Sequence, residues 1–186
     1  LATARRRLAH TLELDELGPI VTRALERSRS VTDAALYLLL YDGTGFEKLA
    51  RIGDKAPPRI EIATANAMLE QLKHGPVLLE QVDRSSREKR PVPAGHHPHE
   101  AVLAAAEVLG PLRGAIVLGI FAETRDLIGL LVLVDDRVRD AFSPEEVALF
   151  ETLAGQIGVV VENSEVYAKL KERDRLAVLG QMAAGL

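Results

Sequence analysis

The chain has 186 residues and a mass of 20.2 kDa, enough for one domain with extensions. Its net charge of −4 argues against a general nucleic-acid binder, and the absence of cysteine excludes disulfides, thiolate metal sites, thiol nucleophiles and thioether-linked cofactors. The longest apolar stretch, near residues 115–121, is far shorter than the roughly 20 residues of a membrane-spanning helix.

The chain begins at Leu1 rather than at a methionine, so we expect a piece of a longer protein. Residues 1–13 contain three consecutive arginines next to leucines and indicate a connector helix that enters from upstream. A second helix is predicted from Leu14 onward, because apolar residues recur at helical spacing. These residues are Leu17, Ile20, Val21, Ala24 and Leu25.

A β-hairpin is predicted next, with apolar strands at residues 34–41 and 46–52. The sequence Asp-Gly-Thr-Gly between them is typical of a tight turn, because glycine adopts positive φ without steric cost. Residues 59–62 alternate polar and apolar and predict a short strand. A helix is expected over residues 63–73, and a short edge strand over residues 77–79.

Residues 83–99 are polar, basic and proline-containing, and predict a long loop. The basic side chains in it, if they cover a ligand pocket, form a lid; otherwise they belong to a solvated loop. The lid residues are Arg84, Arg87, Lys89 and Arg90. His96, His97 and His99 have imidazoles that suit a transition metal, but neighbouring histidines seldom point the same way, and we expect no metal site.

The strongest strand signals lie further along the chain, after a short alanine-rich helix predicted over residues 100–109. Residues 115–121 and 127–135 are almost continuously apolar and are separated by a short turn. We therefore expect an antiparallel pair of central strands, buried on both faces.

The clearest helix start is Ser143-Pro144-Glu145-Glu146, a capping box with proline at the first helical position. Nothing in the sequence interrupts the predicted helix before Gly180, which implies a helix of roughly 35–40 residues, about 55 Å long. Its apolar stripe extends past the domain and predicts a dimer seam. The seam residues are Leu153, Ile157, Val160, Tyr167, Leu176 and Leu179.

The seam changes phase over residues 168–175, which is the pattern of a coiled-coil stutter. The alternative is a solvated helix tail. We favour a two-stranded connector, because Leu176 and Leu179 would otherwise be exposed.

The order of elements resembles that of the GAF sensor domain over residues 14–167. The resemblance is most specific in AIVLGIFAETRDLIGLLVLVDD and in AFSPEEVALFETLAGQIGVVVENSEVY. It implies an α+β fold with a GAF-like antiparallel sheet, helices packed on one face, and a long C-terminal signalling helix. The lack of cysteine excludes the cysteine-linked tetrapyrroles and the thiol-based methionine sulfoxide reductase activity of some GAF branches. The Asn-Lys-Phe-Asp-Glu signature of cyclic-nucleotide-binding GAF domains is also missing.

Residues 173–186 (RDRLAVLGQMAAGL) resemble the opening of the dimerisation helix of sensor histidine kinases, especially the nitrogen-regulation-like group. In that family the segment leads into an Ala-His-Glu motif with the phosphoacceptor histidine. The phosphoacceptor is therefore not among the five histidines of this chain. We divide the chain into an upstream connector (1–13), a GAF domain (14–167), and a coiled-coil connector with the start of the kinase dimerisation helix (168–186).

Together these observations predict the regulatory GAF domain of a two-component sensor histidine kinase, with no catalytic residues of its own. The resemblance implies a homodimer, contact with the parent kinase core, and a response regulator reached through the parent. We expect a cytoplasmic location, a parent that can be membrane-anchored upstream, and no nucleic-acid or membrane contact by this fragment. No cofactor is evident, and the small-molecule ligand is unknown.

The alternatives are a ligand-free dimerisation spacer and the GAF domain of another output protein, such as a nucleotide cyclase or a transcription activator. A metal-binding module is the least favoured alternative.

Overall fold

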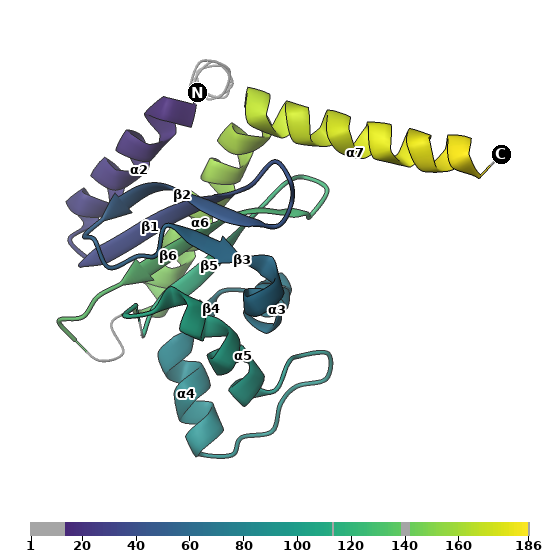
Figure 1. The fold of residues 1–186 in the computed structure, drawn as a ribbon. Coiled ribbons are helices and arrows are strands. Elements are labelled where there is room, and N and C mark those ends of the chain that lie inside the picture. Colours follow the sequence, from purple (N-terminus) through teal and green to yellow (C-terminus); the bar gives the residue numbers. More distant parts are fainter. Residues whose placement is uncertain (1–13, 113, 139–141, 186) are drawn as a thin grey trace.

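The computed structural model describes residues 14–112, 114–138 and 142–185 (Figure 1). The connector helix predicted for residues 1–13 lies outside the described part of the chain. The described residues form one six-stranded sheet in the order β3-β2-β1-β6-β5-β4, and every neighbouring pair is antiparallel. The strands are β1 (Asp33–Leu39), β2 (Gly45–Ile52), β3 (Arg59–Glu61), β4 (Val77–Leu78), β5 (Ile116–Phe121) and β6 (Leu127–Val134).

The predicted strands and most predicted helices are present, within a few residues of their expected bounds. No helix in the described ranges combines the length and the apolar character needed to cross a bilayer. The α-helices are α2 (Leu14–Ser28), α3 (Ile62–Gln71), α4 (Leu79–Arg87), α5 (His99–Ala106), α6 (Pro144–Glu162) and α7 (Glu165–Ala184). Two short 3₁₀ helices, η1 (Leu72–His74) and η2 (Glu107–Leu109), follow α3 and α5.

Helices cover both faces of the sheet, so the expectation of helices on one face was wrong (Figure 1). The cause is the side-chain alternation of the central strands. In β1, Tyr37 points to the face covered by α3 and α5, whereas Leu36 points to the face covered by α2 and α6. Both faces are apolar, and each needs a helical layer to exclude water.

The helix α6 lies close to the sheet because Gly158 has no side chain. A Cβ atom at this position would lie 2.7 Å from the carbonyl oxygen of Phe121 in β5. Phe150 and Ile157, on the same side of α6, are 1% and 2% exposed. The N-terminal half of the predicted C-terminal helix is therefore part of the domain core.

The capping box predicted at the start of α6 is confirmed. The Glu146 amide donates to the Ser143 hydroxyl at 3.2 Å, and the Ser143 amide donates to the Glu146 carboxylate at 2.9 Å. These two bonds satisfy amide groups that a helix start otherwise leaves unpaired. The backbone amide of Ser143 is the main reason why the pKa of Glu146 lies below its usual value.

The prediction of one uninterrupted helix from Ser143 to Gly180 was wrong. The helix breaks at Asn163 and Ser164, and α7 then runs crosswise to α6 and away from the domain (Figure 1). The Asn163 side-chain amide donates to the Val159 carbonyl at 2.7 Å, and the Ser164 hydroxyl donates to the Val161 carbonyl at 2.5 Å. Both side chains compete with the backbone for helical acceptors, which explains the break.

The Ser143→Ala substitution tests the capping box. Loss of the cap removes a side-chain acceptor from the helix start, and we expect the free energy of unfolding to fall by about 1 kcal/mol. Urea denaturation followed by circular dichroism measures the change. The matched control is Thr152→Ala, because Thr152 is exposed in the middle of α6 and its replacement removes no cap. An equal loss in both variants would contradict the capping role.

Candidate functional site

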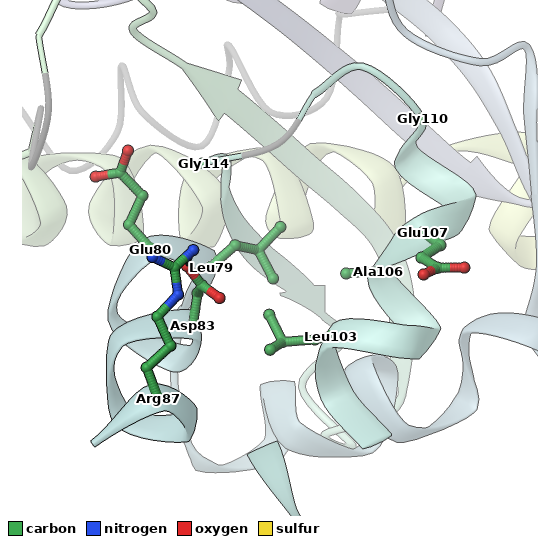
Figure 2. Close-up of a pocket in the computed structure, with 9 residues that line it drawn as sticks. All are labelled: Leu79, Glu80, Asp83, Arg87, Leu103, Ala106, Glu107, Gly110 and Gly114. Atoms are coloured by element: carbon green, nitrogen blue, oxygen red, sulfur yellow. Dashed lines mark ion pairs between the residues drawn. The ribbon is translucent and has the colours of Figure 1, made fainter. Parts of the chain in front are cut away.

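A groove of about 730 Å³ lies between α4 and the α5–η2 segment. Figure 2 shows Leu79 and Leu103 facing each other across it. Gly110 and Gly114 form its upper rim, both with positive φ. The lining residues are Leu79, Glu80, Asp83, Arg87, Leu103, Ala106, Glu107, Gly110 and Gly114.

One wall of the groove is α4, which occupies part of the segment predicted as a loop. The loop prediction for residues 83–99 was therefore wrong for its first residues, since α4 ends only at Arg87. Leu79 and Val82 provide the apolar contacts that attach this polar helix to the core. Glu80 in the first turn and Arg87 in the last turn also suit the helix dipole.

The groove has an acidic lining among the described residues. Three carboxylates, those of Glu80, Asp83 and Glu107, stand against the single guanidinium of Arg87. Arg87 forms an ion pair with Asp83 at 2.7 Å, one helical turn away. The described lining therefore combines apolar side chains with charged groups of both signs.

A hydrogen bond joins the two helical walls. The Ser86 hydroxyl at the end of α4 donates to the Glu100 carboxylate at the start of α5, at 2.9 Å. The pKa of Glu100 is lowered, first by its own backbone amide and then by Ser86. This bond fixes the spacing of the helices at the end of the groove nearest the loop.

The four predicted lid residues do not gather at one place. Arg87 lines the groove, and Arg84 is on the same helix. Lys89 and Arg90 follow the end of α4, and Arg90 is paired with Glu88 at 2.6 Å. The lid role stays a prediction, and Arg87 is the member of the set that contacts the groove.

The space between the sheet and helices α3 and α5 is filled by the chain's own side chains. Tyr37, Met68 and Leu109 are at most 1% exposed there. The Tyr37 hydroxyl donates to the Pro57 carbonyl at 2.7 Å, and burial raises the pKa of Tyr37. This layer is a packed core, so the groove outside it is the better candidate for a ligand.

The histidine-containing loop is held against η1. The rings of His74 and His96 stack with centroids 4.0 Å apart, and His74 Nε2 bonds to the Gly95 carbonyl at 3.1 Å. The buried Nε2 atom of His99 has no hydrogen-bond partner among the described residues. Across the same residues, no cluster of three or more histidine, aspartate or glutamate side chains has a geometry suited to a metal ion.

The predicted seam residues fall into two groups. Ile157 is 2% exposed in the core of its own protomer, and Leu153 and Val160 are half-buried beside it. Leu176 and Leu179 on α7 are 58% and 49% exposed. The side chain of Tyr167 lies outside the described part of the structure.

Comparison with known proteins places this architecture in a family. The sequence matches the GAF domain family over residues 11–162, and the chain therefore belongs to that family. A comparison with curated proteins found no match.

Several solved structures share the fold. A putative GAF sensor protein from Burkholderia vietnamiensis is 19% identical, with a TM-score of 0.54 over 92% of this chain and 89% of that one. Residues 122 to 287 of a methyl-accepting chemotaxis protein are 12% identical, with a TM-score of 0.59 over 84% and 93%. The free methionine-R-sulfoxide reductase from Neisseria meningitidis is 17% identical, with a TM-score of 0.58 over 86% and 84%. At these identities the likeness establishes the GAF fold.

The acidic residues of the groove were missed at the sequence level. Glu80 and Asp83 lie at i and i+3, a spacing that places them on one helical face once α4 is recognised. Glu107 comes from a different element, and no sequence pattern connects it with the other two.

The structure predicts opposite effects for two glycine substitutions, one at the rim of the groove and one inside α6. Gly114 has φ +80°, and a Cβ atom there would lie 3.1 Å from Glu80 Oε1, so Gly114→Ala should lower the free energy of unfolding by at least about 1 kcal/mol. Gly155, inside α6, has open space around it, and Gly155→Ala should raise stability by about 0.5–1 kcal/mol. Thermal and urea denaturation measure both. An unchanged or stabilised Gly114→Ala variant would contradict the described rim.

Proposed function

We propose that this chain is the regulatory, signal-sensing GAF domain of a two-component sensor histidine kinase. It has no catalytic role itself, and it passes a signal through its C-terminal helices to a phosphoacceptor and an ATP-binding domain of the same protein. The observation that carries the proposal is α7, a 20-residue helix that leaves the domain with apolar side chains exposed. A sensory module needs such an output element.

The exposed side chains of α7 support pairing with a second copy. Leu176, Leu179 and Met182 are between 49% and 66% exposed, and most helical stability in proteins comes from packing an apolar face against a neighbour. A parallel homodimer would bury Leu176 and Leu179 at the spacing of a coiled-coil seam. The resemblance of residues 173–186 to a kinase dimerisation helix supports the same arrangement.

We place the ligand site of this sensor in the groove between α4 and α5. Its volume suits a drug-sized or smaller molecule, and its lining combines apolar side chains with a few charged groups, as is common in small-molecule sites. The second candidate, a ligand-free relay spacer, is favoured by the filled core between the sheet and α3. The two candidates differ in whether a molecule occupies the groove.

The exposed seam can be tested without disturbing the domain core. We expect Leu176→Asp and Leu179→Asp to abolish the dimer and leave the unfolding transition of the domain unchanged, because neither side chain contacts the core. Sedimentation equilibrium measures the mass. The matched control is Val178→Asp, also exposed at 55% but off the predicted seam, which should remain dimeric. A dimer that persists in both leucine variants would refute the seam. Ile157 is unsuitable here, because an aspartate in the core would unfold the domain.

Native mass spectrometry of the purified chain, followed by the same sample after denaturation, separates sensor from spacer. A dimer with extra mass that is lost on denaturation supports the sensor and gives the ligand mass. The ligand should disappear in Ala106→Trp, which fills the groove, and persist in the exposed-surface control Ala104→Trp. A dimer without extra mass favours the spacer.

Sequencing the gene beyond codon 186 tests the kinase itself, for which an Ala-His-Glu motif is expected within about ten codons.

A further inference from the structure

The C-terminal helix does not simply project from the domain, because one of its side chains is attached to the β1–β2 hairpin. Arg173 Nη1 donates to the carbonyl oxygen of Tyr41, and the guanidinium lies 5.3 Å from the centroid of the Tyr41 ring. The two residues are 132 positions apart in the sequence. A cation above an aromatic ring is attracted to the face of that ring, and the added hydrogen bond fixes the direction of approach.

The hairpin presents Tyr41 on a stiff turn. Asp42 accepts from both the amide of Thr44 at 2.9 Å and its hydroxyl at 2.6 Å. These bonds lower the pKa of Asp42, so its carboxylate is charged and also attracts Arg173. Arg59 in β3 donates to the Thr44 hydroxyl at 2.7 Å, which ties the turn to the next strand.

The backbone at the break between α6 and α7 can adopt helical geometry. Asn163 has φ −84° and ψ 0°, roughly 20° and 40° from ideal helical values. The Ser164 amide bonds to the Val161 carbonyl at 2.9 Å, three residues back, as in a tightened last turn. Neither residue is proline or glycine, so a continuous helix through 163 and 164 is sterically allowed.

We propose that the Arg173–Tyr41 contact is a latch that holds α7 in a docked position against the β1–β2 hairpin, and that its release lets α6 and α7 join into one helix. Arg173 lies one turn before Leu176, so the docked hairpin stands beside the exposed part of the predicted seam on α7. The docked position therefore hinders pairing of α7 with a second copy, and the released position permits it. The docking itself is independent of the proposed kinase role, and only its consequence for pairing rests on that role.

The absence of cysteine makes the latch directly measurable. We would introduce Glu47→Cys on β2 and Gln181→Cys near the end of α7, both at exposed positions, and attach spin labels. Labelled chain diluted into excess unlabelled chain gives the distance within one protomer by double electron–electron resonance. We expect a dominant short-distance population in the otherwise unmodified chain.

Three variants test the contact. Arg173→Ala and Tyr41→Leu should each lower the ratio of short-distance to long-distance populations by roughly two- to fivefold, and the double variant should add little to either. Arg175→Ala is the matched control, because it removes the same charge two residues further along α7, where the side chain is exposed. The double variant Asn163→Ala/Ser164→Ala should shift the population in the same direction as Arg173→Ala, since it favours the continuous helix.

The outcomes separate the latch from the proposed function. A distance distribution that is the same in Arg173→Ala and Arg175→Ala, or a lack of the short-distance population at the outset, overturns the latch. A latch confirmed by distance together with a tighter dimer in Arg173→Ala supports both the contact and its consequence. A latch confirmed by distance with the same dimer constant in Arg173→Ala overturns the consequence for pairing and leaves the docking contact in place.

Discussion

The constraint on which the structure depends is that β6 is buried on both faces. Seven of its eight residues are buried, and it pairs along most of its length with β1 on one side and β5 on the other. A strand in this position needs a helical layer on each side to exclude water. The chain supplies α2 and α6 for one side, and α3 and α5 for the other. Because α6 belongs to one of these layers, it contacts the sheet directly, with Gly158 close against the backbone of Phe121.

The sequence was sufficient for the strands and for the start of α6. The strands at 115–121 and 127–135 follow from apolar runs bounded by a short turn, and the capping box at Ser143 follows from local chemistry. The same apolar runs also implied burial on both faces, and helices on one face are incompatible with that burial. The correct arrangement, with one helical layer on each face of the sheet, could therefore have been predicted from the residues of β5 and β6. The error came from the assumed family pattern.

The helix break after α6 and the helix α4 could not be predicted, because local preferences and tertiary contacts compete at both places. Asn163 and Ser164 have only slightly unfavourable helix propensities, so nothing in the sequence alone marks a break there. The polar run Asp83-Arg84-Ser85-Ser86 has no helical period, and α4 forms because Leu79 and Val82 attach it to the core. The groove is less predictable still, since its lining comes from three separate segments that only the fold brings together. The membership of the GAF family follows from the sequence, whereas the place of a ligand does not.

Two interactions of α7 compete: the burial of its leucines in a dimer seam, and the docking contact between Arg173 and Tyr41. Burial of one leucine side chain contributes about 1.5–3 kcal/mol, whereas an exposed cation–π contact contributes about 0.5–1 kcal/mol. A seam that buries Leu176 and Leu179 from two chains therefore outweighs a single Arg173–Tyr41 contact. Residues 169–175, however, contain one apolar residue, Leu170, and contribute little to such a seam. Pairing is weakest where Arg173 lies, so the docking contact competes with the part of the seam that holds the two copies together least strongly.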